Sequence, residues 1–168
     1  YDVRQYNPDK AVALLEGLGF KRGTDGVFVT PNGTRFELTV IVGEWGKDEG
    51  EMIAEDLRAI GIDAVAKPTP WAAYWDWWSR LQFDLLEGWN TPPSIHYAFY
   101  DAHLYSKNTL PIGESVGEEA NRLRYNNTEL DRLVEEMRVT DPETPRGKEI
   151  LQQLHGIYLR DLPGIPLR

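Results

Sequence analysis

The chain has 168 residues, of which 41% are hydrophobic and 27% charged, and this composition fits one globular domain, or one domain with a small appendage. Its net charge of −9 argues against nucleic acid and anionic membrane surfaces as partners, because both are bound through Lys and Arg. The absence of cysteine excludes disulfides, thiolate metal sites and thiol nucleophiles.

The first 42 residues predict a helix followed by a hairpin. Asn7-Pro8-Asp9 is typical of a helix start, and Gly19 of a helix end. Next, Pro31-Asn32-Gly33 separates two β-rich runs at residues 26–30 and 34–42. Asn-Gly between such runs predicts a hairpin turn.

A strand–helix–strand unit follows from the second of these runs. Residues 48–60 are amphipathic and are followed by a β-rich run at residues 62–66. A connection of this length predicts a right-handed crossover between two parallel strands. The apolar side of the helix is expected to consist of Met52, Ile53, Leu57 and Ile60.

The central part of the chain is rich in aromatic residues. Residues 71–81 predict a helix and residues 83–86 a short strand, while residues 87–125 predict a long irregular segment. A segment of that length is usually functional or disordered, and its aromatic content argues against disorder. One face of the helix would carry a stripe that docks on the sheet as core, made of Trp71, Tyr74, Trp75 and Trp78.

Two helices are expected near the C-terminus. Asn126-Asn127-Thr128-Glu129 resembles a capping box, and Pro145 opens the last helix, which ends at Leu162-Pro163. The predicted fold is therefore α/β, with a mixed sheet and helices on both faces. The chain starts and ends abruptly, as a piece cut from a longer protein would.

Several segments, in order, resemble family 5 of the extracellular solute-binding proteins of ABC transporters, which includes oligopeptide-, dipeptide- and some oligosaccharide-binding proteins. They span nearly the whole chain: residues 6–20, residues 38–62, Phe83-Asp84 with Gly88-Trp89, residues 124–131, and Leu162-Pro163-Gly164-Ile165-Pro166-Leu167. The resemblance implies that residues 1–168 form a single C-terminal lobe of a two-lobed, periplasmic-binding-protein-like fold. The N-terminal lobe of the same chain would be missing.

The same resemblance implies function, partners and location. The protein would capture an extracellular solute between two lobes and deliver it to an ABC transporter permease. It would be periplasmic or extracellular, with a lipoprotein anchor through the missing N-terminus as one option. No enzymatic activity, catalytic residue, cofactor or metal is expected.

The residues after Phe83-Asp84 would reach the ligand cleft. Peptide binders of the family carry an aspartate three positions after the tryptophan that matches Trp89, whereas this chain has Pro92. Residues 83–100 contain no Lys or Arg, and a buried charged terminus without a partner is costly. We therefore expect a neutral oligosaccharide, bound by aromatic faces and uncharged polar groups of Trp89, Asn90, Thr91, Ser94 and Tyr97, with Trp71 and Trp75.

Other possibilities stay open at this point. The other lobe could supply the charges for a peptide, and nickel, opines or other small solutes are further options. His96 and His103 match no tight metal-binding spacing. A glycoside hydrolase would need a carboxylate pair among Asp76, Asp84, Glu87 and Asp101. A carbohydrate-binding module would be all-β, which the expected helices contradict.

Overall fold

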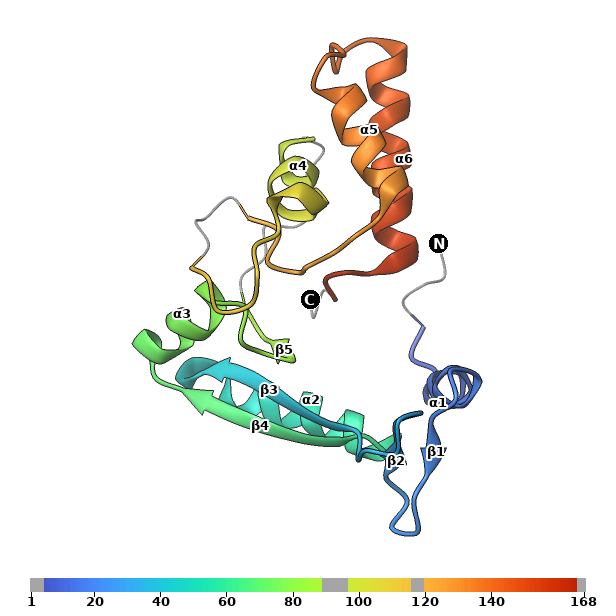
Figure 1. Ribbon diagram of the computed structural model, residues 1–168, viewed down its shortest axis with the longest axis vertical. Helices are drawn as coiled ribbons and strands as arrows, with labels where there is room; N and C mark the ends of the chain where they lie inside the picture. The colour runs from blue at the N-terminus through green and yellow to red at the C-terminus, as the bar shows by residue number, and fades with distance from the viewer. Residues whose placement is uncertain (1–4, 89–96, 116–119, 166–168) are drawn as a thin grey trace. The chain divides into compact units, whose positions relative to one another are not determined.

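In the computed structural model, which describes residues 5–88, 97–115 and 120–165, the chain forms two compact units. The sheet unit comprises Arg4–Trp78 and Gln82–Gly88. The helical unit comprises Tyr1–Val3, Ser79–Leu81 and Trp89–Arg168. Figure 1 labels the elements of both units. The single lobe expected over residues 1–168 concerns both units together and stays a prediction.

The sheet unit is built on three parallel strands. The central strand, β3 (Glu37–Gly43), pairs with β4 (Asp63–Thr69) on one side and with β5 (Leu85–Leu86) on the other. A short 3₁₀ turn, η1 (Glu44–Gly46), and helix α2 (Lys47–Ala59) connect β3 to β4. The predicted strand–helix–strand unit and its parallel pair are confirmed.

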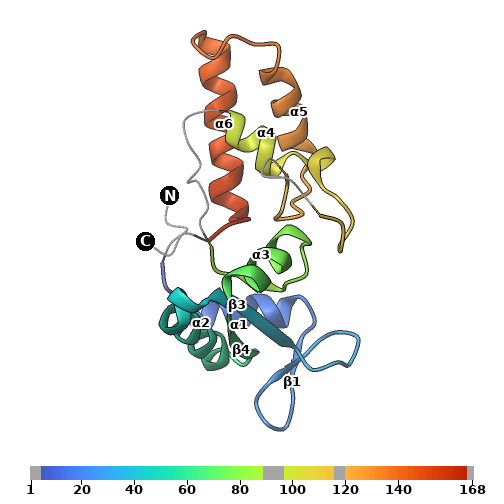
Figure 2. The same ribbon diagram turned by 90° about the vertical axis from the view of Figure 1, so that its left-hand side faces the viewer.

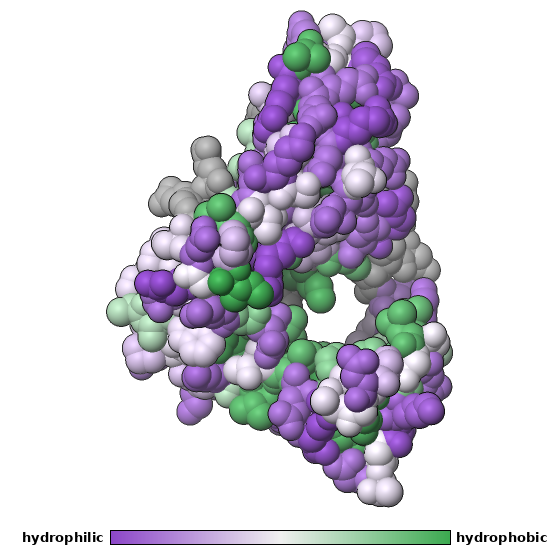
Figure 3. All heavy atoms as spheres, in the orientation of Figure 1, coloured by the Kyte–Doolittle hydropathy of each residue, from purple (hydrophilic) through white to green (hydrophobic). Residues whose placement is uncertain are grey.

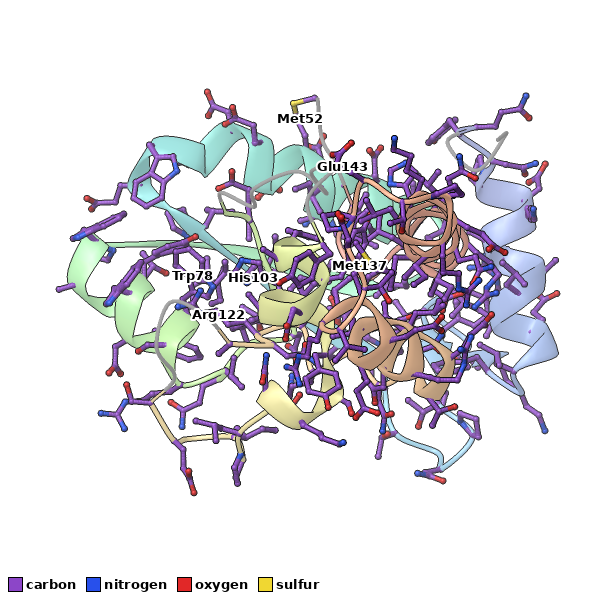
Figure 4. All side chains as sticks on the ribbon, turned by 90° about the horizontal axis from the view of Figure 1, so that it is seen from above. Met52, Trp78, His103, Arg122, Met137 and Glu143 are labelled. Atoms are coloured by element: carbon purple, nitrogen blue, oxygen red, sulfur yellow. The ribbon has the colours of Figure 1, made fainter. Side chains whose placement is uncertain are left out.

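Helix α2 covers one face of this sheet (Figures 1 and 2). Its buried residues are small, namely Gly50 and Ala54, and a Cβ on Gly50 would lie 2.6 Å from Cγ1 of Val42. The prediction that Met52 belongs to the buried face was wrong, because its side chain is 65% exposed and points outward (Figure 4). Close approach to the sheet selects small side chains on this helix, and hydrophobic spacing does not reveal that selection.

Helix α3 (Trp71–Ser79) follows β4 and contacts the opposite face of the sheet. Pro68 is paired with Val42, which faces Gly50 of α2. Side chains alternate between the two faces of a strand, so the neighbouring Lys67 points away from α2. Its Nζ lies 4.3 Å from the centre of the Trp77 ring. Helices on both faces are thereby confirmed. β4 forms one edge of the three-stranded sheet, where Pro68 is tolerated because an edge strand has N–H groups that need no partner strand.

The first elements of the sheet unit lie outside the parallel sheet. Helix α1 (Pro8–Gly17) begins as predicted, with the Asn7 side chain accepting a hydrogen bond from the Lys10 N–H at 2.9 Å. The strands β1 (Lys21–Arg22) and β2 (Phe28–Val29) pair antiparallel. The predicted turn at residues 31–33 is present, since Thr30 N donates to Thr34 O at 2.7 Å.

Parallel and antiparallel pairings occupy two separate sheets among the described strands, and not one mixed sheet. A single antiparallel bridge joins Val29 to Arg35, just before β3 begins. β2 has only two residues, so the hairpin that it forms with β1 is short. The pairing in this hairpin ends before β3 begins, and β3 therefore does not join the same sheet.

The helical unit contains α4 (Ala98–Leu104), the 3₁₀ turn η2 (Ser106–Asn108), α5 (Thr128–Met137) and α6 (Pro145–Asp161). The predicted starts of the last two helices are confirmed: α5 begins after Asn127, whose side chain accepts hydrogen bonds from two N–H groups of the helix, and α6 opens with Pro145. The cap of α6 is Thr144, which was not predicted from the sequence. Leu162 ends α6 in the left-handed conformation.

One apolar core fills the helical unit. It draws on all three α-helices, and Figure 4 shows Met137 between α5 and α6. The side of α5 and α6 seen in Figure 3 is covered mostly by hydrophilic residues. Its core residues are Phe99, Tyr100, Leu104, Tyr105, Leu130, Leu133, Val134, Met137, Ile150, Leu154, Ile157 and Tyr158.

The segment expected to be irregular, residues 87–125, therefore contains a helix. α4 has no side-chain cap. It is also too short for apolar residues to recur over several turns, so the sequence does not reveal it. η2 is held by Asp131, whose Oδ1 accepts a hydrogen bond from Ser106 N at 2.9 Å. This is a structural role for an acid in the first turn of α5. Among the described helices none is both long and apolar enough to cross a bilayer.

Candidate functional site

The candidate site lies where the three parallel strands of the sheet unit end. Open α/β sheets bind ligands beyond the carboxyl ends of their strands, where the chain leaves the sheet in loops. β3 leads into Trp45, β4 leads into Trp71, and β5 leads into Glu87 and Gly88. Parallel pairing brings these three exits to the same edge of the sheet.

Three exposed indoles gather at this edge, and we call Trp45, Trp71 and Trp75 the tryptophan row. Their exposed fractions are 46%, 52% and 39%, respectively. The ring centres of Trp45 and Trp71 are 5.4 Å apart, and those of Trp71 and Trp75 are 5.9 Å apart. The row is therefore one continuous aromatic surface that is accessible to solvent within the sheet unit.

Tyr74 forms the buried base of this surface. Its side chain is fully buried, and its ring contacts Trp45 edge-on at 5.1 Å and stacks with Trp71 at 6.0 Å. Its hydroxyl donates a hydrogen bond to the Glu87 carbonyl at 2.9 Å. Burial, with a smaller contribution from the negative charge of Glu87, raises the pKa of Tyr74 to about 12, so the hydroxyl stays a donor at neutral pH.

The turn after β5 is packed tightly against this base. Glu87 N donates to Ile41 O at 2.9 Å, which anchors the turn to the central strand. A Cβ on Gly88 would lie 2.5 Å from the Tyr74 hydroxyl, and a Cβ on Gly46 would lie 2.7 Å from Oε2 of Glu87. A side chain at Gly88 would therefore press on the buried Tyr74, and one at Gly46 would displace the Glu87 carboxylate.

The expected core stripe on α3 therefore divides into two environments. Tyr74 is core, as predicted, and Trp78 is half-buried with its ring 5.9 Å from the Tyr74 ring. Trp71 and Trp75, the two candidates for ligand contact on this helix, lie at its surface. The helix thus has one buried anchor and two accessible rings.

The remaining predicted ligand residues have different positions. Trp89, Asn90, Thr91 and Ser94, with His96, lie outside the described residues. Tyr97 is partly buried and packs against the core of the helical unit, directly before α4. The contribution of these residues to ligand binding stays a prediction.

Sequence reasoning missed Trp45. It stands alone in a polar context, Gly43-Glu44-Trp45-Gly46, and no helical or strand spacing links it to α3. The available signal was its position directly after the central strand of a strand–helix–strand unit, which is where ligand-binding loops of parallel sheets begin.

The carboxylates considered for catalysis have structural partners in two cases. Asp84 Oδ2 accepts a hydrogen bond from Thr39 N at 3.0 Å, which agrees with the structural role implied by the resemblance. Asp101 accepts two hydrogen bonds from the Arg138 guanidinium, at 2.6 and 2.9 Å. Within the described part of the chain, no group of three or more metal-ligating side chains is present.

Exposed indole faces are suited to binding. They stack on the C–H faces of sugar rings and on apolar side chains of peptides. The geometry of the sheet edge therefore indicates a ligand-contacting surface.

Comparison with known proteins agrees with the sequence resemblance. The family described as bacterial extracellular solute-binding proteins, family 5 (middle), matches residues 1–110, which is more than half of the chain. No curated protein matches the chain in sequence.

Solved structures match along almost the full chain. A periplasmic oligopeptide-binding protein of an oligopeptide ABC transporter from Thermotoga maritima, bound to mannohexaose, is 29% identical over 96% of the chain, with a TM-score of 0.76. A second structure from that source is 30% identical over 96%, with a TM-score of 0.77. An oligopeptide-binding protein from Thermus thermophilus, complexed with a pentapeptide, is 26% identical over 99%, with a TM-score of 0.69.

The chain is much shorter than these proteins. It covers 30%, 31% and 30% of their respective chains. The α/β lobe of a solute-binding protein predicted from the sequence is thereby confirmed as a fold.

Proposed function

Because the chain belongs to the bacterial extracellular solute-binding proteins of family 5, we propose that it is part of the component that captures a solute for an ABC importer. The ligand would be held between this part and the rest of the same protein. Contact with both sides would favour the closed form, which docks on a membrane permease. The location would be periplasmic or extracellular, with a lipoprotein anchor as a further proposal.

The observation that carries this proposal is the tryptophan row at the carboxyl edge of the parallel sheet. Trp71 and Trp75 are substantially exposed although their neighbour Tyr74 is fully buried on the same helix. An exposed apolar cluster of this kind marks an interaction site more often than it marks incomplete packing. Its position coincides with the edge at which open α/β sheets bind ligands.

The solute that we favour is an oligosaccharide. Aromatic planes complement the C–H faces of sugar rings, and residues 83–100 provide amides and hydroxyls but neither Lys nor Arg. The T. maritima protein bound to mannohexaose, at 29% identity, supports this choice.

A peptide is the second candidate. The T. thermophilus protein complexed with a pentapeptide is 26% identical, and exposed indoles also accept apolar peptide side chains. In that case the charged ends of the peptide would be neutralised by groups outside residues 83–100.

We further propose that the protein is not an enzyme. The hydrogen bonds of Asp84 and Asp101 to structural partners support this view, because they occupy two of the four carboxylates that a glycosidase would need to draw on. A reducing-sugar assay with mannohexaose tests it: release of reducing ends above the buffer control would contradict the proposal.

The binding proposal is tested by titration calorimetry of the 168-residue chain with mannohexaose, cellohexaose and a pentapeptide, at millimolar ligand concentrations. Measurable binding of a hexasaccharide, with Trp71→Ala lowering the affinity about 5- to 30-fold, is the expected result, since an exposed aromatic anchor contributes about 1–2 kcal/mol. Trp77→Ala is the matched control, because Trp77 lies outside the row, under Lys67.

Binding of the pentapeptide alone would replace the oligosaccharide with the peptide alternative. No binding of any of the three ligands to the wild-type chain would overturn the proposal for this surface. An affinity equal to that of an intact solute-binding protein would contradict the clamp, because half of the contacts should be missing.

A further inference from the structure

We propose that Trp45 is a ligand-contacting, specificity-determining residue, and that Gly43 exists to seat its ring against the end of the central strand. The inference rests on the proposed binding function and extends it to a residue on the other side of the row from α3. The ligand class is a neutral sugar ring that stacks on the exposed aromatic surface of Trp45 and Trp71.

The first observation is the close approach between Trp45 and Gly43. A Cβ added to Gly43 would overlap the six-membered ring of the Trp45 indole. The backbone of Gly43 is extended, with φ −68° and ψ 161°, a conformation that any residue adopts. Glycine is therefore required at this position by the indole ring and not by the path of the chain.

The second observation is that Trp45 is supported from below while staying exposed. Its ring meets the buried Tyr74 ring edge-on, at 5.1 Å and 70°. Nearly half of the residue, 46%, is nevertheless exposed. A ring that is fixed by a glycine seat and a buried tyrosine is preorganised, which lowers the entropic cost of binding.

The third observation is the angle between Trp45 and its neighbour. The two indole planes are inclined by 54° with ring centres 5.4 Å apart, whereas Trp71 and Trp75 are nearly parallel, at 26°. At a centre-to-centre distance of 5.4 Å the two indoles touch each other, so a ligand stacks on their exposed faces and does not enter between them. A pyranose presents apolar C–H faces that stack on an indole plane, whereas an extended peptide backbone presents polar amide groups.

The test uses the hexasaccharide, mannohexaose or cellohexaose, that the wild-type chain binds more tightly, with a pentapeptide as the comparison ligand. Trp45→Ala should lower the hexasaccharide affinity about tenfold, the usual range for an aromatic anchor, and change the pentapeptide affinity less than about twofold. Trp45→Phe should restore part of the loss, because a ring remains. Trp77→Ala should leave both affinities unchanged.

Gly43→Ala provides an independent variant that keeps the indole but displaces it. It should reduce hexasaccharide affinity by a factor similar to that of Trp45→Ala and alter the near-ultraviolet circular dichroism of the aromatic cluster. Far-ultraviolet circular dichroism checks that each variant is folded.

The outcomes separate this inference from the function on which it rests. If Trp71→Ala weakens hexasaccharide binding but Trp45→Ala and Gly43→Ala do not, the role of Trp45 is wrong and the proposed function stands. If the wild-type chain binds the pentapeptide but no hexasaccharide, the role of Trp45 is wrong and the proposed function stands with a peptide as its solute. If it binds none of these ligands, both are wrong. Equal losses for hexasaccharide and pentapeptide would refute the specificity role.

Discussion

The two units of the chain differ in how far their aromatic residues are buried. In the helical unit Tyr100, Tyr105 and Tyr158 are buried, and each hydroxyl has a partner: His155 Nδ1, Glu135 Oε1 and the Gly164 carbonyl, respectively. Among the tyrosines described in the sheet unit, Tyr74 is buried with a hydrogen-bonded hydroxyl, while the tryptophan row stays exposed. Aromatic rings thus form core in the helical unit, whereas the sheet unit buries Phe28 and Tyr74 and leaves the tryptophan row at its surface.

This difference teaches how to separate packing from binding in an aromatic-rich sequence. Burying apolar surface stabilises a fold by about 25 cal/mol per Å², so leaving three indoles in water forgoes a substantial stabilisation. The helical unit shows that the chain can bury its aromatic rings where only stability is required. The contrast therefore supports the proposal that a ligand covers the exposed row.

The largest effect expected from this comparison is loss of core packing in the helical unit. Leu154 is fully buried in α6, and Leu154→Ala should lower the free energy of unfolding by about 2–5 kcal/mol. Urea unfolding followed by far-ultraviolet circular dichroism measures it. Val139→Ala is the control, since Val139 is 88% exposed and should change stability by less than about 0.5 kcal/mol.

If Leu154→Ala and Val139→Ala gave the same unfolding curve, the helical unit would not have the closed core described above. The helical unit could then no longer serve as the example of a closed core with which the sheet unit is compared.

Glycine-to-alanine substitutions are expected to change stability by smaller amounts. The change should have opposite signs in the two units. Gly50→Ala in α2 would place a methyl group 2.6 Å from Val42 and should destabilise the sheet unit by about 1–3 kcal/mol. Gly156 in α6 has no atom within 4 Å of the corresponding position, and Gly156→Ala should stabilise its helix by about 0.5–1 kcal/mol. Thermal unfolding of both variants measures the difference.

A stabilising Gly50→Ala would show that α2 can move away from the sheet without loss. The explanation of the exposed Met52 by close helix–sheet approach would then be wrong.

The buried tyrosines are expected to have the smallest effect on the free energy of unfolding at neutral pH. This effect grows as the pH becomes alkaline. Burial raises the pKa of Tyr74 and of Tyr100 from 10.0 to about 12. The folded state favours the neutral phenol, so this stabilisation is complete below about pH 10 and is lost as pH rises through about pH 12. Urea midpoints measured from about pH 8 to about pH 12 should fall over that window.

Tyr74→Phe and Tyr100→Phe should each make the alkaline decline shallower, because the phenylalanine ring cannot ionise. The single variants assign the decline to the sheet unit or to the helical unit. An unchanged decline in both variants would contradict the assignment.

Much of the fold follows from the sequence because its signals are local. Asn7 and Asn127 cap helices, and the capping residues lie within a few positions of the groups that they satisfy. Gly33 likewise adopts the positive φ that the predicted turn requires. The parallel pairing of β3 and β4 was predictable because the connection between them is a single helix.

The misses concern contacts between distant residues. Met52 has the spacing of a core residue, yet the small side chains of Gly50 and Ala54 decide which side of α2 meets the sheet. Helix α4 has no cap, and it is held by packing against α5 and α6. For the site, Trp71 and Trp75 were identified by composition, whereas Trp45 joins them only through the pairing of β3 with β4.

Pro68 in the edge strand β4 has a consequence for the protein at high concentration. Exposed strand edges invite the strands of other molecules to pair with them, and neighbouring Val65, 58% exposed, would strengthen such pairing. Proline lacks the N–H group that an incoming strand needs, and Lys67 beside it adds a charge that would be repelled by its own copy. Pro68 and Lys67 therefore disfavour pairing of β4 with the same strand of another copy of the chain.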